Sequence, residues 1–244
     1  MKETILTIAE NTPVTADVCR MVLTGDVSAI TAAGQFVNIQ LDGLYLRRPI
    51  SVCDVQGDAL TILYKVVGRG TEQMRRLAVG SKLNVLTGLG NGYDLSVSGQ
   101  KPLLLGGGVG VPPMYLLAKK LRAQGKEVSV VLGFNTKSEV FYEAEFAALG
   151  CNVTVTTADG SYGKIGFVTD ALPTDYTYFY TCGPEPMLRA VYKATETQGQ
   201  FSFEQRMGCG FGACMGCSCK TITGYKRICK EGPVLRKEEI LWAD

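Results

Sequence analysis

The sequence predicts a multidomain β plus α/β protein whose three domains cover residues 1–98, 99–204 and 205–244. Three observations lead to this expectation. Short β-type runs fill the first segment, apolar runs alternate with helical stretches in the second, and five of the nine cysteines lie between Cys209 and Cys229 in the third. A chain of 244 residues is long enough to give two or three small domains cores of their own.

The first domain has the pattern of an antiparallel barrel or sandwich. Its strand candidates are separated by Gly, Asp or Asn turns at the short intervals typical of such folds. These candidates are residues 5–9, 18–23, 35–41, 51–56, 59–66 and 82–86. One short helix is expected over residues 72–78, with Thr71 as its N-cap.

The second domain has the alternation of βαβ units on a parallel sheet. The strand candidates are residues 102–105, 128–132, 152–156 and 176–181, and the helix candidates are residues 113–124, 143–149 and 186–197. Gly125 is expected to end the first of these helices.

The third domain has few large apolar residues, so burial alone does not readily fold it. We expect sparse secondary structure there and a bound metal centre that supplies the missing constraint.

Composition and charge exclude several kinds of function. The 25 Lys and Arg against 23 Asp and Glu leave a formal charge of +2, without the basic surplus of a nucleic-acid-binding protein. The lack of histidine removes the usual general base, the Ser-His-Asp triad and histidine-based metal and haem sites. The N-terminus lacks the apolar run of a signal peptide, and glycines and prolines break the most apolar stretch, residues 103–118, before it could span a membrane. We therefore expect a cytoplasmic protein whose cysteines bind metal and form no disulfides.

The most specific motif is a cysteine cluster in the third domain. Cys209, Cys214 and Cys217 have the C-x4-C-x2-C spacing of plant-type [2Fe-2S] proteins. The fourth ligand is Cys219 or Cys229, and we favour Cys229 because one intervening residue makes chelation by Cys217 and Cys219 awkward. A structural zinc site and unligated thiols are the alternatives, although zinc more often takes two C-x2-C pairs.

A glycine-rich turn between a strand and a helix predicts a nucleotide site. Glycines let the backbone approach a pyrophosphate, and the helix N-terminus adds its dipole and free N–H groups. A second Gly/Pro turn follows the 176–181 strand, so both turns are expected at the carboxyl edge of one sheet. The candidate residues are Gly107, Gly108, Gly110, Pro112, Cys182, Gly183 and Pro184. Close helix packing alone is the alternative explanation, and the motif leaves NAD against NADP undecided.

A third motif lies in the first domain, where Arg47 and Arg48 could clamp phosphate oxygens ahead of Ser51. A solvated barrel face is the alternative for an arginine pair. The neighbouring runs 63–65 and 70–71 add an aromatic ring, a cation and a helix start, which together suit a flavin and its pyrophosphate.

The order of barrel, nucleotide domain and cysteine-rich tail resembles the ferredoxin-reductase superfamily. A narrower resemblance covers essentially the whole chain, to the electron-transfer subunits of class 1B, NAD-dependent dihydroorotate dehydrogenase. It is carried by the runs Arg48-Pro-Ile-Ser51, Gly90-Asn-Gly92, Gly106-Gly-Gly-Val-Gly-Val-Pro-Pro113, Asp159-Gly-Ser-Tyr-Gly163, Cys182-Gly-Pro184 and Cys209-Gly-Phe-Gly-Ala-Cys214. Ile50 stands where the wider superfamily has tyrosine.

The resemblance implies a site for each cofactor. FAD would be held by Arg48, Pro49, Ile50, Ser51, Leu63, Tyr64, Lys65, Gly70 and Thr71, with Arg48 on the pyrophosphate and Ser51 near the flavin ring. The [2Fe-2S] cluster would be held by Cys209, Cys214, Cys217 and Cys229. No residue of this chain is expected to act chemically on the substrate.

The resemblance also implies a partner and a pathway, pyrimidine biosynthesis. A separate FMN-containing catalytic subunit would oxidise dihydroorotate to orotate, within a heterotetramer of two of each chain. Electrons would pass singly through the cluster to FAD, which would reduce NAD+. The alternatives are a subunit of an NAD(P)H-dependent ferredoxin or sulfide reductase and a non-catalytic zinc or redox-sensing module.

Two smaller expectations concern exposed and buried side chains. Phe211 and Met215 are apolar residues in the cluster loop, and we expect them to contact the catalytic subunit. Cys182 either faces the nicotinamide or is a buried thiol at a strand end, whereas Cys19, Cys53 and Cys151 are expected to be packing residues. All four lie outside the cluster motif, and isolated thiols commonly behave as small buried hydrophobic residues.

Overall fold

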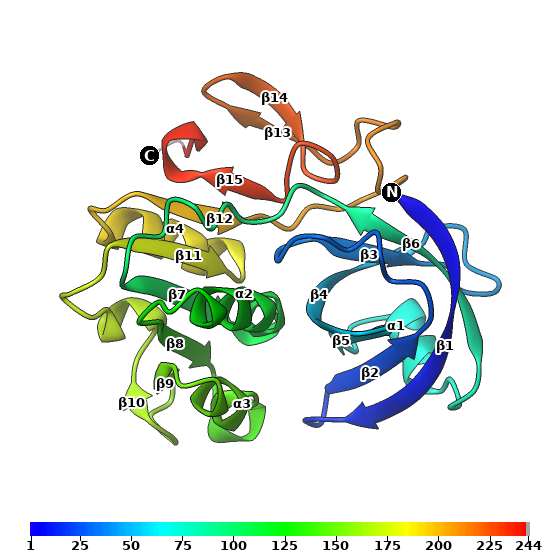
Figure 1. Ribbon diagram of the computed structural model, residues 1–244, viewed down its shortest axis with the longest axis horizontal. Helices are drawn as coiled ribbons and strands as arrows, with labels where there is room; N and C mark the ends of the chain where they lie inside the picture. The colour runs from blue at the N-terminus through cyan, green and yellow to red at the C-terminus, as the bar shows by residue number, and fades with distance from the viewer. Residues whose placement is uncertain (243–244) are drawn as a thin grey trace.

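The computed structural model describes residues 1–242 and confirms the predicted fold class. A closed six-stranded antiparallel barrel precedes a seven-stranded, mostly parallel sheet, and a two-stranded hairpin lies near the C-terminus (Figure 1). Among these described residues, no helix combines the length and the apolar character needed to cross a membrane.

The barrel has the strand order β1-β2-β5-β4-β3-β6, with β6 closing onto β1. Its strands are β1 (Lys2–Pro13), β2 (Val18–Thr24), β3 (Phe36–Ile39), β4 (Arg48–Gln56), β5 (Ala59–Lys65) and β6 (Lys82–Leu89). Alternate residues point inward, and Leu6, Ile8, Met21, Val37 and Ile62 are fully buried. Closure removes the sheet edges, so the barrel is the correct one of the two predicted β architectures.

The predicted short helix forms, but it begins earlier than expected. Helix α1 covers Arg69–Arg75 and its N-cap is Gly68, so the prediction of Thr71 as N-cap is wrong. Thr71 is the third helical residue, and its Oγ1 accepts the N–H groups of Val67 at 3.0 Å and Gly68 at 3.3 Å. The hydroxyl therefore ties the preceding loop to the helix from inside the first turn.

The α/β part follows its predicted alternation, with strand order β10-β9-β8-β7-β11-β12-β15. The strands are β7 (Pro102–Gly107), β8 (Ser129–Phe134), β9 (Asn152–Thr157), β10 (Lys164–Ile165), β11 (Tyr178–Cys182) and β12 (Gly199–Ser202). The helices are α2 (Val111–Ala123), α3 (Glu143–Ala148) and α4 (Glu185–Ala194). Gly125 ends α2 with φ of +75° and donates its N–H to the carbonyl of Arg122 at 2.9 Å, which confirms that expectation.

The C-terminal segment has more regular structure than expected. Strands β13 (Ser218–Thr221) and β14 (Gly224–Arg227) form an antiparallel hairpin, and β15 (Val234–Arg236) pairs antiparallel with β12. The expectation of sparse secondary structure is wrong here, because backbone pairing with β12 supplies order that apolar content does not. The division at residue 204 stays a prediction.

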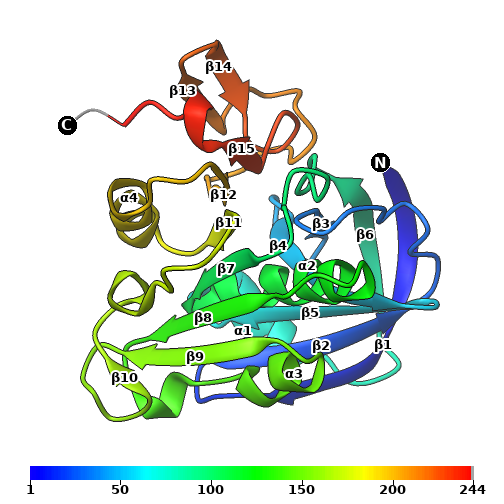
Figure 2. The ribbon, with the colours of Figure 1, turned by 60° about the vertical axis from the view of Figure 1, so that its left-hand side comes forward.

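The barrel and the parallel sheet are joined by a polar contact as well as by apolar packing. Helix α2 lies against β4, and the Nζ of Lys119 donates to both carboxylate oxygens of Asp54 at 2.9 Å. Figure 2 shows the hairpin β13–β14 above β12, and the Nδ2 of Asn38 on β3 donates to the carbonyl of Cys209 at 3.3 Å. The C-terminal segment therefore lies over the junction of the other two parts.

Candidate functional site

The C-terminal cysteines lie in two pairs. The N–H of Cys214 donates to the Sγ of Cys209 at 3.4 Å, and the N–H of Cys209 donates to the Sγ of Cys214 at 3.5 Å. In the second pair, the N–H of Cys229 donates to the Sγ of Cys217 at 3.4 Å. The structure therefore brings Cys217 in the loop close to Cys229, which is twelve positions later in the sequence.

The loop favours a thiolate at its first cysteine. Burial raises the pKa of the Cys209 thiol, but the N–H groups of Phe211, Cys214 and Ala213 outweigh it and lower this pKa to about 6. Burial, together with the neighbouring Cys217 and Cys209, raises the pKa of Cys229 to about 12. Thiolates crowded in this way repel one another, and a cationic iron centre relieves that repulsion.

The paired arrangement fits a dinuclear cluster better than a single ion. A [2Fe-2S] centre takes two cysteines at each iron, whereas one zinc needs four converging ligands. Within residues 1–242, no three cysteine or carboxylate side chains converge as ligands of one ion. Cys219, the alternative fourth ligand, lies half-buried on β13, where burial raises its pKa. The geometry favours Cys229 over Cys219.

The two glycine-containing turns lie side by side at the carboxyl edge of the sheet. Strands β7 and β11 are parallel neighbours, and Cys182 at the end of β11 pairs with Gly106 near the end of β7. The chain then passes through a single turn at Gly108–Gly110 into α2, whose first turn contains Pro112. This edge of an open parallel sheet is where such folds bind nucleotides.

The glycines in these turns have different surroundings. A Cβ on Gly110 would lie 2.2 Å from the carbonyl oxygen of Cys182, and a Cβ on Gly107 would lie 2.3 Å from the Sδ of Met187. Gly183 faces the same Met187 sulfur, and Pro184 is the N-cap of α4. Gly108 has φ of +52° and a Cβ there would meet no atom within 4 Å. Gly110 therefore permits the two turns to touch, while Gly108 leaves space in front of them.

The two arginines at the start of β4 have different partners: Arg48 is the first residue of the strand and Arg47 precedes it. Arg47 is occupied by the protein itself, since it donates to Asn84 at 2.8 Å and pairs with Glu3 at 3.1 Å. The expectation that both arginines clamp phosphate is therefore wrong for Arg47. The guanidinium of Arg48 lies against the start of α1, where a Cβ on Gly70 would be 2.1 Å from its Nε. Arg48 is the arginine of the pair that remains for an anionic cofactor.

The other predicted flavin residues lie on β4, on β5 and at the start of α1. Pro49, Ile50 and Ser51 are half-buried on β4, and Leu63 and Tyr64 are buried on β5. The hydroxyl of Tyr64 donates to Asn11 at 2.9 Å, and Lys65 pairs with Asp17 at 2.9 Å. Because these side chains already have partners, a flavin contact with Tyr64 and Lys65 would rely mainly on their backbone.

The isolated cysteines are buried, as expected. Cys19, Cys53 and Cys151 are all buried, and burial raises the pKa of Cys53 to about 12 and that of Cys151 to about 11. Burial also raises the pKa of Cys182 to about 12. At neutral pH Cys182 is therefore a neutral thiol, which suits a packing role at the strand end as well as an uncharged contact with a nicotinamide.

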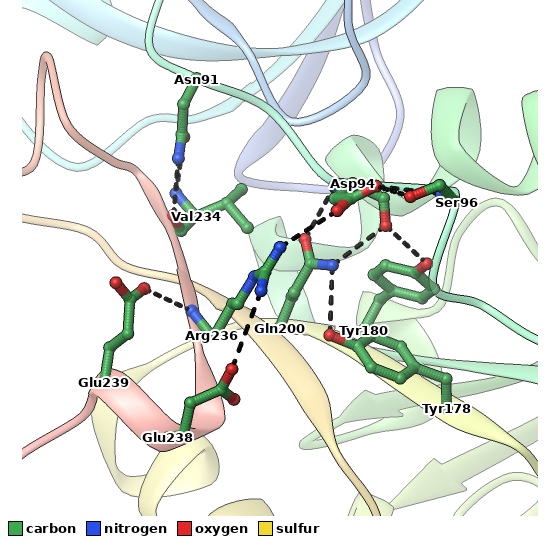
Figure 3. Close-up of polar contacts among 10 residues, drawn as sticks. All are labelled: Asn91, Asp94, Ser96, Tyr178, Tyr180, Gln200, Val234, Arg236, Glu238 and Glu239. Atoms are coloured by element: carbon green, nitrogen blue, oxygen red, sulfur yellow. Dashed lines mark hydrogen bonds and ion pairs between the residues drawn. The ribbon is translucent and has the colours of Figure 1, made fainter.

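Sequence reasoning missed a polar junction where β12 and β15 meet the segment between β6 and β7 that contains Asn91 and Asp94. A cavity of about 260 Å³ opens there. Asn91 donates to the carbonyl of Val234 at 2.7 Å, and Gln200 donates to the carbonyl of Asp94 at 3.0 Å (Figure 3). Arg236 pairs with Asp94 at 3.3 Å. Only the Gly90-Asn-Gly92 motif could have drawn attention to this junction, and its partners are more than 100 residues away.

Two carboxylates at the sheet edge were also missed. Glu139 follows β8 and accepts the N–H of Asn135 at 3.2 Å, and Asp159 follows β9 and accepts the N–H of Ser161 at 2.9 Å. The N–H of Asp159 donates to the carbonyl of Asn135 at 3.2 Å, so the two turns are adjacent. Carboxylates at this edge are of the kind that binds a ribose in dinucleotide-binding folds.

Comparisons with known proteins agree with this geometry. A family model described as the iron-sulfur cluster binding domain of dihydroorotate dehydrogenase B matches residues 204–241, and an oxidoreductase NAD-binding domain model matches residues 104–193. The chain is 41% identical over 256 residues to a protein of Shouchella clausii (strain KSM-K16), with 98% of each chain covered. It is 42% identical over 257 residues to one of Fusobacterium nucleatum, with 98% of this chain and 99% of the relative covered. Both are named dihydroorotate dehydrogenase B (NAD(+)), electron transfer subunit.

Solved structures share the same architecture. A chain of the NADH-dependent reduced ferredoxin-NADP oxidoreductase superposes with a TM-score of 0.89 at 28% identity, covering 98% of this chain and 90% of that chain. An Amycolatopsis cytochrome P450 reductase superposes with a TM-score of 0.71 at 23% identity, covering 79% of this chain and 65% of that one, and shares the fold alone.

Proposed function

The chain belongs to the family of dihydroorotate dehydrogenase B electron transfer subunits, and from this premise we propose that it carries electrons from a catalytic partner subunit to NAD+. The single observation that supports this most directly is the arrangement of four cysteines in two pairs, Cys209 with Cys214 and Cys217 with Cys229. The loop that contains the first three contacts the barrel through Asn38. When bound, the iron-sulfur cluster would supply one-electron transfer, and the FAD would link it to the two-electron reduction of NAD+.

In this proposal each part of the chain holds one redox group. The loop that contains Cys209, Cys214 and Cys217 binds the cluster together with Cys229, and its N–H groups stabilise the negative sulfurs. Arg48 neutralises the FAD pyrophosphate beside the start of α1. The turns after β7 and β11 take the NAD pyrophosphate at the sheet edge. The chain thus positions and tunes its cofactors and needs no histidine.

The partner in this proposal is an FMN-containing subunit that oxidises dihydroorotate, in a heterotetramer with two copies of each chain. Phe211 and Met215 form part of the contact with it. Their side chains are 42% and 53% exposed although both are apolar, and they lie in the same loop as the cluster ligands. A contact there would bring the partner's redox group close to the cluster.

A second candidate is supported by the 0.89 superposition on a ferredoxin-NADP oxidoreductase chain. In that case the partner would exchange electrons with ferredoxin, and dihydroorotate would have no effect. The zinc-module alternative has less support, because the thiols lie in two pairs rather than around one point.

The proposed function is tested with the complete two-subunit complex. The chain is purified together with a dihydroorotate-oxidising subunit, and NADH formation is followed after adding dihydroorotate and NAD+. We expect NADH to form only when both subunits are present. A complex that holds iron and flavin but stays oxidised with dihydroorotate, and becomes reduced when reduced ferredoxin is added, would replace this function by the second candidate.

A further inference from the structure

One barrel residue reaches the cluster loop directly. Asn38 lies on β3, and its Nδ2 donates to the carbonyl oxygen of Cys209 at 3.3 Å. The loop lies tightly on this side chain, since a Cβ on Gly210 would be 2.3 Å from the same nitrogen. Gly210 also has φ of +77°. The peptide that follows the first cysteine is therefore shaped around the Asn38 amide.

The same residue belongs to the flavin side of the barrel. β3 pairs with β4, and Asn38 is directly opposite Pro49 while Phe36 is opposite Ser51. Residues directly opposite in an antiparallel pair share one face of the sheet. Asn38 therefore connects the cluster loop with the strand that carries the candidate flavin residues.

The burial of the Asn38 amide costs folding free energy, which is unexpected for a residue that only stabilises the fold. Its side chain is 1% exposed, and its Oδ1 is buried with no hydrogen-bond partner among residues 1–242. Buried polar groups are normally satisfied, and an apolar residue of the same shape usually serves stability as well or better. The one hydrogen bond that the Asn38 amide makes among the described residues is its donation to the carbonyl of Cys209.

We propose that Asn38 is a positioning residue for the iron-sulfur cluster, holding the Cys209 peptide against the flavin-binding strand. The inference rests on the proposed function, because it needs a cluster at Cys209. Donation to the carbonyl of Cys209 fixes the peptide between Cys209 and Gly210, and with it the placement of the Cys209 sulfur that would bind the cluster.

Asn91 offers a matched control. It also comes from outside the C-terminal segment and anchors it, donating to the carbonyl of Val234 at 2.7 Å and to that of Glu231 at 3.2 Å. Neither of these two hydrogen bonds involves a cysteine. Loss of Asn91 therefore removes an anchor of the same segment without changing the Cys209 peptide.

The test compares Asn38→Ala, Asn38→Leu and Asn91→Ala in the full chain with its cofactors. Iron, sulfide and flavin are measured first, then the EPR spectrum and reduction potential of the cluster, and finally the unfolding temperature. We expect both Asn38 variants to change the reduction potential and EPR spectrum of the cluster or to lose the cluster. Asn91→Ala should keep the parent potential and lower the unfolding temperature. Asn38→Leu keeps the packing, so its preparations that retain iron and sulfide should unfold at or above the parent temperature.

Other outcomes overturn the inference. Parent-like spectra and potential in both Asn38 variants would show that the amide does not position the cluster. The same shift in Asn91→Ala would show that general anchoring is responsible. A parent chain without iron and sulfide would instead defeat the proposed function itself, and that failure is recognised before any variant is compared.

Discussion

Gly110→Ala perturbs the contact between the two turns of the candidate nucleotide site. The added Cβ would lie 2.2 Å from the carbonyl oxygen of Cys182 and 2.6 Å from the N of Gly183, whereas ordinary contact begins at 3.4 Å. The clashing atoms are backbone, so the turn after β11 must move as a unit. Overpacking of this kind costs about 1–3 kcal/mol.

Two measurable effects are expected from this displacement. The unfolding temperature should fall by about 2–12 °C, given about 2–4 °C per kcal/mol for a chain of this size. Affinity for NADH should fall about tenfold, which corresponds to about 1.4 kcal/mol, because the two turns no longer meet in the binding geometry. Thermal unfolding and anaerobic NADH titration of the purified chain measure both quantities.

Gly107→Ala is the control within the same turn. Its backbone is ordinary, with φ of −119°, and its Cβ would meet the flexible Sδ of Met187 at 2.3 Å. The sulfur can rotate away, so the loss of stability should stay below about 1 kcal/mol. An unfolding temperature for Gly110→Ala equal to that of the parent, with unchanged NADH affinity, would refute the contact between the turns.

Three further predictions concern the cluster. Cys229→Ser should lose nearly all of the iron and acid-labile sulfide while Cys219→Ser keeps them; equal retention in both variants would contradict the assignment of the fourth ligand. Arg227→Ala removes a 2.6 Å bond to the carbonyl of Gly212 together with the pair to Glu231, and loss of the Gly212 bond, worth about 1 kcal/mol, should speed bleaching of the cluster absorbance in air about fivefold; Arg189→Ala on α4, which loses the equivalent pair with Glu185, should bleach at the parent rate. Phe211→Ala together with Met215→Ala should weaken binding of the catalytic subunit at least tenfold by titration calorimetry, since two exposed apolar side chains are lost, and unchanged affinity would eliminate the proposed interface.

Local patterns allowed most of the fold to be predicted. The period-two runs of the barrel predict β1–β6, and the strand-helix alternation after residue 101 predicts β7, β8, β9 and β11, with boundaries that differ by a few residues. The short strands β10 and β12 were not predicted. The start of α1 was less predictable. Both Gly68 and Thr71 are compatible with a cap, and the choice depends on how the hydroxyl of Thr71 folds back onto the loop.

The cluster motif could be predicted because its first three cysteines are neighbours in sequence. Cys229 required a choice, since its proximity to Cys217 depends on the β13–β14 hairpin that brings the chain back. Asn38 and Asn91 could not be predicted, because their partners Cys209 and Val234 are 171 and 143 residues away. Arg47 resembled a phosphate ligand until the fold placed Asn84 and Glu3 beside it.

The most direct test of the electron-transfer account is an anaerobic titration of the purified chain with NADH, with the visible spectrum recorded alongside iron, sulfide and flavin content. The account predicts iron, acid-labile sulfide and FAD in the protein, with NADH bleaching the flavin and [2Fe-2S] bands together. A colourless chain that holds zinc and does not respond to NADH or NADPH would contradict it.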